Sequence, residues 1–204
     1  MTIYKKLLGK DFERLHPKLQ ERYALSLDTP FVGIGVMRQI KTGSKILSPF
    51  LHLATRFRFL FPESGMNVPF TIKNTSRLLP TGEVEVYWER TFYFKSGQRQ
   101  FNAFMTIDTE KRIVKDYLGN PNLFYSDLDF TVTKEGRLII RSGAQRLLLS
   151  KVGIPLPPFL QGRVTVEEGY DDSKDMFTIH VYIHNPIVGR LMAYAGEFKA
   201  QPHK

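Results

Sequence analysis

The chain has 204 residues, of which 42% are hydrophobic and 24% are charged, and its formal net charge at pH 7 is +9. This balance is typical of a globular domain, and the absence of cysteine excludes disulfides, thiolate chemistry and a cysteine zinc site. No segment reaches the roughly 18 apolar residues of a membrane-spanning helix, and the first residues do not resemble a signal peptide. We therefore expect a soluble, cytoplasmic protein with a single domain over residues 1–204, the last few residues being disordered.

The positive charge is concentrated near the start of the chain. Residues 1–62 hold eleven Lys and Arg against four Asp and Glu. Such a segment is either a solvated basic face or a surface for an anionic partner such as lipid headgroups. Nucleic acid is not an expected partner, because the chain has no RNP-like motif, zinc finger or arginine-rich tract.

The first elements in chain order are short helical turns followed by a strand. Asp11 can cap one turn, and Pro17 can open a second one that runs to Tyr23. Residues 31–40 predict a strand that contains Gly33-Ile34-Gly35. These are the first glycines of a dinucleotide fingerprint, but Arg38 stands where the third should be and no ordinary helix follows. We therefore expect no nucleotide cofactor.

An apolar helix is predicted near residues 48–61. Ser48-Pro49 is a typical helix start and Pro62 a firm stop. One alternative is an interfacial helix whose Arg56 and Arg58 contact lipid headgroups. Side chains two positions apart are separated by about 200° around a helix, so these arginines form no single basic face. We favour burial against a sheet, through an apolar face made of Ile46, Phe50, Leu53, Phe57, Leu60 and Phe61.

From residue 65 onward the pattern is β. Short segments of alternating polarity are separated by tight turns, which is typical of an antiparallel meander. The predicted fold class is α+β, with a mainly antiparallel, strongly curved or barrel-like sheet, N-terminal helical turns and the apolar helix. The predicted strands lie near 68–79, 83–95, 98–107, 112–118, 127–133, 137–142, 163–170, 176–184 and 188–199.

One arginine interrupts an apolar strand face. From residue 83 to 95 the even positions are apolar or aromatic, apart from Arg90, and the odd positions are mostly polar. Since successive side chains of a strand point to opposite faces, Arg90 is expected in the core beside Trp88. A buried guanidinium needs a partner, so either an internal acid or an anionic ligand must pair with it.

Hairpin geometry suggests neighbours for Arg90. A two-residue Ser96-Gly97 turn would pair Arg90 with Ala103, Trp88 with Met105 and Phe92 with Phe101. Ala103 would leave space for the guanidinium or for a ligand. Glu168 is expected to point inward opposite Phe177, and a tight turn at 109–110 would place Asp116 across from Ala103. Arg90 is thus either in an ion pair with one of these two acids or the anchor for a ligand in an apolar cavity.

Other constellations do not support chemistry. His180 and His184 share a strand face but lie about 13 Å apart along it, which is too far to share a metal. No nucleophile, metal or phosphate-loop motif is present, and nothing singles out Asp116, Glu168 and Tyr87 for acid–base catalysis. We therefore predict no catalytic residue, metal or cofactor.

The predicted function is a non-catalytic binding module for an apolar, anionic small molecule of the lipid or fatty-acid type. The alternative is a membrane-surface or protein-interaction domain that uses the basic N-terminal third. The residues expected to bind the ligand are Arg90, Trp88, Phe92, Phe101, Ala103, Met105, Glu168 and Asp116.

Several motifs together resemble a known bacterial family. They are Leu8-Gly9, Leu15-His16-Pro17, Phe61-Pro62-Glu63-Ser64-Gly65, Trp88-Glu89-Arg90-Thr91-Phe92, Asn185-Pro186-Ile187-Val188-Gly189 and Tyr194-Ala195-Gly196. The chain is similar over nearly its whole length to domain of unknown function 4166. The resemblance implies a domain that occurs alone or fused behind saccharopine-dehydrogenase-like oxidoreductase domains. This chain carries no such domain, so an adjunct role would act in trans. The resemblance implies no activity for Arg90 or Glu168.

Overall fold

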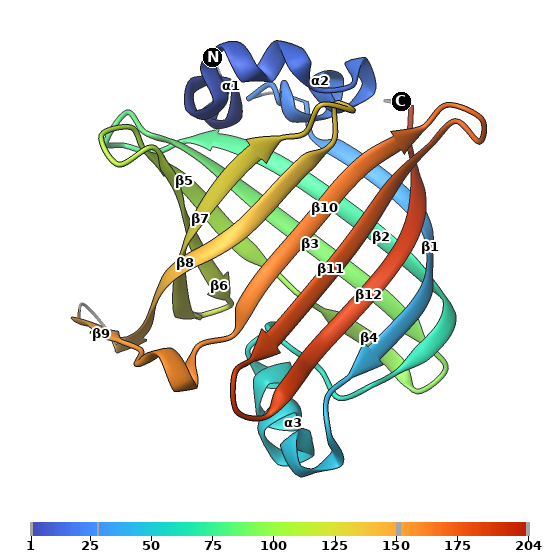
Figure 1. Cartoon of the computed structure of the whole chain (residues 1–204), viewed down its shortest axis with the longest axis vertical. Coiled ribbons are helices and arrows are strands. Elements are labelled where there is room, and N and C mark those ends of the chain that lie inside the picture. Colours follow the sequence, from blue (N-terminus) through green and yellow to red (C-terminus); the bar gives the residue numbers. More distant parts are fainter. Residues whose placement is uncertain (1, 28, 150–151, 203–204) are drawn as a thin grey trace.

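The structure, a computed structural model, describes residues 2–27, 29–149 and 152–202. In this part of the chain twelve antiparallel strands form one sheet, and ten of them close into a barrel (Figure 1). The strands are β1 (Phe31–Thr42), β2 (Gly65–Leu78), β3 (Val84–Phe94), β4 (Gly97–Gln100), β5 (Ala103–Asp108), β6 (Ile113–Gly119), β7 (Asn122–Val132), β8 (Leu138–Leu149), β9 (Val152–Pro155), β10 (Arg163–Asp171), β11 (Met176–Asn185) and β12 (Gly189–Ala200).

The barrel closes because β10 pairs with two neighbours. One edge of β10 pairs with β11 and the other with β8, which joins the two ends of the strand order β10-β11-β12-β1-β2-β3-β5-β6-β7-β8. Strands β4 and β9 lie outside this circuit and extend β3 and β8. Closure leaves each barrel strand paired on both sides and encloses an interior.

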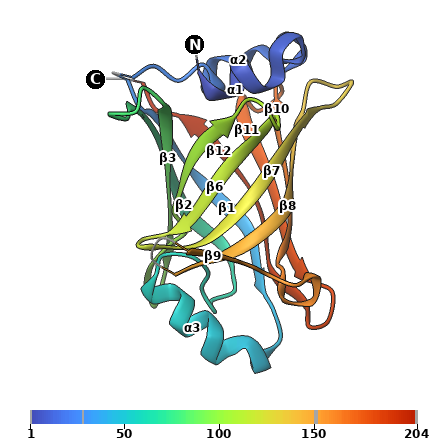
Figure 2. The same ribbon diagram turned by 90° about the vertical axis from the view of Figure 1, so that its left-hand side faces the viewer.

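Helices lie at both ends of the barrel (Figures 1 and 2). The helices α1 (Ile3–Leu8) and α2 (Pro17–Tyr23) and the 3₁₀ turn η1 (Gly9–Arg14) cover one end; we call residues 3–23 the plug. The opposite end carries the 3₁₀ turns η2 (Lys45–Leu47) and η3 (Pro158–Leu160) and the helix α3 (Ser48–Arg56). We call this opposite end the mouth. The fold is thus mostly antiparallel β with a few short helices, a smaller helical share than an α+β description suggests.

Close contact between β1 and β12 explains the glycines of the rejected nucleotide motif. A Cβ atom on Gly35 would overlap the carbonyl oxygen of Glu197, and one on Gly196 would overlap that of Val36. Both positions therefore need glycine so that the two strands can approach each other. The interior space beside Gly33 is filled by Phe198 and Ile72.

All the predicted strands are found, in the predicted order, but some differ in extent: β7 begins at Asn122 rather than near 127, and β8 continues to Leu149 rather than ending near 142. Residues 98–107 are not one strand but β4 and β5, separated by Phe101 and Asn102. Phe101 N still donates to Arg90 O of β3 (2.9 Å), whereas Asn102 N donates away from β3, to Arg58 O (2.9 Å). Strand β9 was not predicted. The predicted disorder of the last few residues concerns positions that lie partly outside the described ones.

The predicted pairing of Arg90 with Ala103 is wrong by two residues. The turn between β3 and β4 is Lys95-Ser96, and Gly97, with a φ of 130°, pairs with Phe94. In consequence Trp88 rather than Arg90 lies opposite Ala103, and Val86 rather than Trp88 lies opposite Met105. Phe92 pairs with Arg99 instead of Phe101.

The predicted cross-strand partners of Asp116 and Glu168 are also wrong by two residues. The turn between β5 and β6 spans residues 109–112, so Asp116 lies opposite Met105, not Ala103. Strand β10 continues to Asp171, so Glu168 lies opposite Ile179, not Phe177. Because a shift of two residues preserves the face of the sheet, the predicted inward direction of both acids is confirmed, and both are buried.

The apolar helix is shorter than predicted and is not buried through the predicted face. It ends at Arg56, and its buried residues are Leu51 and Ala54. Leu60 and Phe61 are buried beyond the helix, whereas Ile46, Phe50 and Leu53 are exposed. The helix lies across the mouth rather than along the sheet wall, so only one narrow side of it meets the barrel (Figure 2).

Candidate functional site

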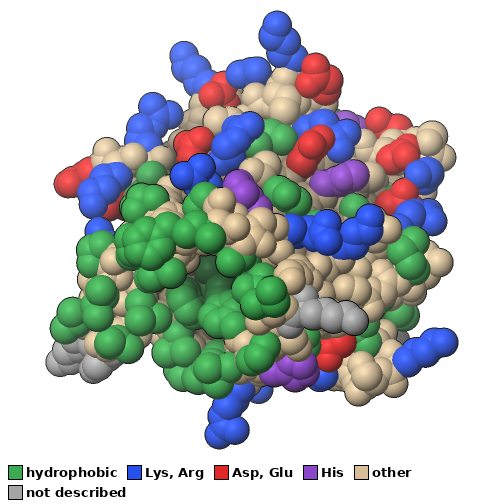
Figure 3. Space-filling model, turned by 60° about the horizontal axis from the view of Figure 1, so that its bottom comes forward, with side chains coloured by type: hydrophobic (Ala, Val, Ile, Leu, Met, Phe, Trp, Pro, Cys, Tyr) green, Lys and Arg blue, Asp and Glu red, His purple; other side chains and the backbone are tan. Residues whose placement is uncertain are grey.

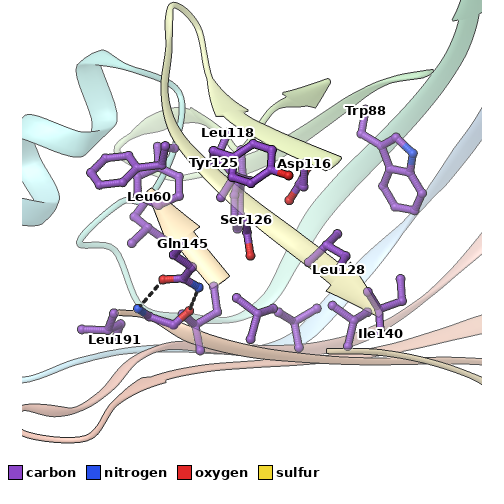
Figure 4. Close-up of a pocket in the computed structure, with 18 of the residues that line it drawn as sticks. Leu60, Trp88, Asp116, Leu118, Tyr125, Ser126, Leu128, Ile140, Gln145 and Leu191 are labelled. Carbon is purple, nitrogen blue, oxygen red and sulfur yellow. Dashed lines mark hydrogen bonds between the residues drawn. The ribbon is translucent and has the colours of Figure 1, made fainter. Parts of the chain in front are cut away.

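A largely apolar cavity occupies the barrel interior (Figure 4). The volume within which the centre of a water molecule can move is about 120 Å³. A site for one water molecule needs roughly 10–15 Å³ on the same measure, so the cavity could hold several. The space free of protein atoms between the lining side chains, including the part open to solvent, is about 1040 Å³. The walls come from β3, β5, β6, β7, β8, β10, β11 and β12, and the mouth contributes Phe50, Phe59, Leu60, Leu156 and Leu160.

The plug closes one end of the barrel through aromatic and polar contacts. Trp88 Nε1 donates a hydrogen bond of 2.8 Å to the Tyr4 hydroxyl, which in turn donates to Met105 Sδ at 3.7 Å. The Tyr4 ring packs edge-on against Tyr23, with 4.8 Å between centroids. Burial raises the pKa of Tyr4, so its hydroxyl stays protonated and can donate. These contacts attach α1 to the inner wall and shield Trp88 from solvent on that side.

A buried ion pair joins the plug to β10. Arg22 Nη1 and the Tyr23 hydroxyl both donate to Glu168 Oε2, the latter at 2.8 Å. Burial lowers the pKa of Arg22, but the Glu168 carboxylate outweighs that effect and holds it above its usual range. Glu168 is therefore committed to the plug, and the predicted Arg90–Glu168 ion pair is wrong.

Aromatic rings surround the Arg22 guanidinium. Its Cζ atom lies 5.0–5.8 Å from five ring centroids, and its Nε and Nη2 atoms have no hydrogen-bond acceptor among the described residues. Cation–π attraction replaces part of the missing hydrogen bonding. The five rings are those of Tyr23, Phe31, Trp88, Phe177 and Phe198.

Arg90 points into the barrel, as predicted, and is 7% exposed. Its Nε donates to the Phe101 carbonyl oxygen at 2.8 Å, and its Cζ lies 4.2 Å from the Phe101 ring centroid and 5.7 Å from that of Trp88. No carboxylate among the described residues lies within the 4.0 Å ion-pair distance of this guanidinium. The predicted Arg90–Asp116 ion pair is therefore also wrong, and the Arg90 guanidinium lies beside the cavity without an acid partner among the described residues.

Asp116 is a second buried ionisable group of the cavity wall. Its Oδ1 atom has no hydrogen-bond partner among the described residues. Burial raises the pKa of Asp116 from 3.8 to about 7, although the charge of Arg90 pulls it down. Near neutral pH this carboxyl is thus protonated in a large fraction of molecules, and it can then donate a hydrogen bond.

Uncharged polar groups complete the wall. The Gln145 side chain is fixed by two bonds to the Gly162 backbone, at 2.7 and 2.9 Å. Ser126 Oγ donates to Asp127 O at 3.0 Å and lies near Asp116 in Figure 4. The rest of that wall is aliphatic or aromatic, so polar groups are few in the lining.

Six of the eight predicted ligand-binding residues line the cavity. They are Trp88, Arg90, Phe101, Met105, Asp116 and Glu168. Phe92 and Ala103 do not: Phe92 is fully buried among Phe61, Phe70 and Tyr194, and Ala103 is fully buried opposite Trp88. The sequence analysis missed Arg22 and Tyr4, whose helices gave no signal of inward polar contacts.

Among the described residues, no group of three or more His, Cys, Asp or Glu side chains could hold a metal ion. None of the described helices is both long enough and apolar enough to cross a membrane.

The fold and the cavity define an antiparallel β-barrel that is plugged at one end and lined inside mainly by apolar side chains. Three buried ionisable residues also line it: Glu168, which pairs with Arg22, and Arg90 and Asp116, which are not paired to each other. Residues 15–198 match the family described as domain of unknown function (DUF4166), and the chain belongs to this family. It is 40% identical over 200 residues to the uncharacterized protein YndH of Bacillus subtilis (strain 168), an alignment that covers 98% of this chain and 97% of YndH.

Proposed function

We propose that the barrel binds an apolar small molecule with an anionic head, such as a fatty acid or another lipid. The observation that carries the proposal is Arg90, a buried guanidinium that faces an apolar cavity without an acid partner among the described residues. Ligand sites typically combine apolar walls with a few placed polar groups. The ligand's chain would lie along the aliphatic walls of β7, β8, β10 and β11, and its head near Arg90.

Asp116 would adjust the site to the charge of its ligand. When Asp116 is ionised, its charge opposes that of Arg90 and disfavours a second anion. When it is protonated, the site is positive, and the carboxyl can donate a hydrogen bond to a ligand carboxylate. A pKa of about 7 places this change at neutral pH. Bound anion would raise the pKa of Asp116 further and so favour the protonated form.

The resemblance-based prediction that the domain acts in trans with a saccharopine-dehydrogenase-like oxidoreductase stays a prediction. The cavity also gives no reason to prefer catalysis. Glu168 is engaged by Arg22 and Tyr23, which leaves Asp116 as the carboxyl of the described lining that could take part in proton transfer.

The test uses Trp88, the sole tryptophan, which lines the cavity and reports binding by its fluorescence. We expect wild-type protein at pH 6.5 to bind hexadecanoate at least about tenfold more tightly than hexadecanol, since only the carboxylate can pair with Arg90. In Arg90→Met the preference should vanish while hexadecanol binds as before. Native mass spectrometry of the freshly purified protein should show a co-purifying lipid-sized ligand.

The matched control is Arg77→Gln, which removes an exposed arginine that pairs with Glu85 outside the cavity and should leave both affinities unchanged. Folded wild-type protein that carries no ligand and binds neither compound would overturn the proposal. If Arg90→Met fails to fold, the wild-type preference for the acid over the alcohol still decides whether a charged head is recognised.

A further inference from the structure

Exposed apolar side chains gather at the mouth of the barrel. Figure 3 shows hydrophobic side chains around a hollow at this end. Among the described residues, seventeen large hydrophobic residues are exposed. Ten of them come from three segments at the mouth, residues 43–62, 144–163 and 184–192. We call these ten the apolar rim: Ile46, Phe50, Leu53, Leu149, Val152, Ile154, Phe159, Leu160, Ile187 and Val188.

The three segments surround the entrance to the cavity. Each contributes side chains to the cavity lining: Phe50 and Leu60 from the first, Leu156 and Leu160 from the second, and Leu191 from the third. The second and third are joined by Asn185 Nδ2, which donates to the carbonyl oxygens of Phe159 (2.7 Å) and Gln161 (2.9 Å). The apolar rim is thus continuous with the apolar interior.

The turn between β11 and β12 is built to hold two rim residues outward. The buried Asn185 Oδ1 accepts hydrogen bonds from the backbone of Ile187 (2.9 Å) and Val188 (3.1 Å). The side chain of Ile187 nevertheless remains 70% exposed. A buried polar side chain therefore fixes the backbone of a turn whose tip is apolar and exposed.

Charge in the three rim segments is of one sign, and Glu63, which follows the first of them, is paired with Arg99. The segments 43–62, 144–163 and 184–192 contain no Asp or Glu. They carry exposed arginines, whereas the turns and helices at the plug end hold Asp11, Glu13, Glu21, Glu83, Asp108, Glu110, Glu135, Asp171, Asp172 and Asp175. The exposed arginines around the rim are Arg56, Arg58, Arg146, Arg163 and Arg190.

We propose that the mouth docks on an anionic lipid bilayer, with the apolar rim inserted among the acyl chains and the arginines at the headgroups. Apolar side chains ringed by cations are what an anionic membrane surface binds. A second copy of the chain is disfavoured, because mouth-to-mouth contact would oppose arginines to arginines. Docking on the bilayer does not depend on the proposed function. Only its consequence does: a lipid ligand would pass directly between the bilayer and the cavity through the mouth.

The experiment is flotation of the full chain with vesicles, without added ligand. We expect binding to phosphatidylcholine vesicles containing phosphatidylglycerol, weak binding to phosphatidylcholine alone, and release at high salt. Leu53→Ser combined with Ile187→Ser should reduce the bound fraction at subsaturating lipid by at least about tenfold, since each side chain loses its apolar burial. Arg56→Gln combined with Arg163→Gln should reduce it mainly at low salt.

Matched controls lie at the plug end. Leu78 and Leu53 are both 59% exposed, so Leu78→Ser should leave binding unchanged, as should Lys10→Gln combined with Lys134→Gln. The same Leu53→Ser, Ile187→Ser protein should still bind hexadecanoate from water, because neither residue lines the cavity. Vesicle binding without ligand binding would overturn the proposed function alone. No vesicle binding, or association into dimers that the rim variant abolishes, would overturn the docking proposal.

Discussion

Glu168→Gln is expected to lower the free energy of unfolding by about 3–5 kcal/mol, because it leaves the Arg22 guanidinium buried without a counter-charge. Both side chains of this ion pair are almost completely buried, and two Arg22 nitrogens already lack an acceptor among the described residues. Glutamine can still accept from Tyr23, so the loss is specific to the charge. Urea denaturation measures the global effect, and hydrogen exchange over residues 3–23 shows whether the plug opens first.

Two further variants separate this charge effect from a general one. Glu85→Gln breaks an ion pair in which Arg77 is 61% exposed, and should cost less than about 1 kcal/mol. Arg22→Met combined with Glu168→Gln removes the unpaired charge and should recover a large part of the stability that Glu168→Gln loses. A Glu168→Gln protein within 1 kcal/mol of wild type, with unchanged exchange in the plug, would contradict the role we assign to this ion pair.

Asp116→Asn is expected to remove a pH-dependent loss of stability. The folded-state pKa of Asp116, about 7, lies above its ordinary value of 3.8, so the folded protein holds a proton that the unfolded chain releases. The stabilisation that protonated Asp116 contributes is fully present below about pH 4. It decreases as the pH rises, and above about pH 7 the free energy of unfolding no longer depends on this residue's titration. The full loss corresponds to up to about 4 kcal/mol.

The measurement is the difference in unfolding free energy between Asp116→Asn and wild type at pH 4, 6 and 8. This difference should shift in favour of the variant by a few kcal/mol between pH 4 and pH 8, because asparagine cannot ionise. Asp129→Asn changes an exposed aspartate of the neighbouring strand β7 and should show no such trend. A difference that stays flat across the series would mean that Asp116 ionises normally in the folded state.

The periodicity of the strands made the interior predictable. The alternation of polar and apolar residues places Arg90 and Glu168 on the inner face, a predicted tight turn at 109–110 places Asp116 there as well, and all three are buried. Their opposite neighbours were wrong by two residues in each hairpin, because register depends on where a turn begins and how long it is. Such lengths are weakly encoded: Lys95-Ser96 and Ser96-Gly97 are both acceptable two-residue turns.

The partner of Glu168 was beyond the reach of the sequence. Arg22 lies 146 residues away on a short helix whose pattern gave no sign of burial. Periodicity describes the faces of one element, whereas the docking of a helix on the end of a barrel depends on the closed three-dimensional shape. The same limit explains α3, whose apolar face was assigned to a sheet wall when the element lies across the mouth.

In chain order the plug precedes every strand that it contacts, and it is therefore among the last parts to find its place. Glu168 must emerge before Arg22 has a counter-ion, and β1 cannot complete its pairing until β12 is available, since Gly33 pairs with Ala200. Contacts between such distant positions slow folding. A growing chain therefore exposes the inner aromatic face until β12 is available, and such exposed apolar surface favours aggregation during synthesis.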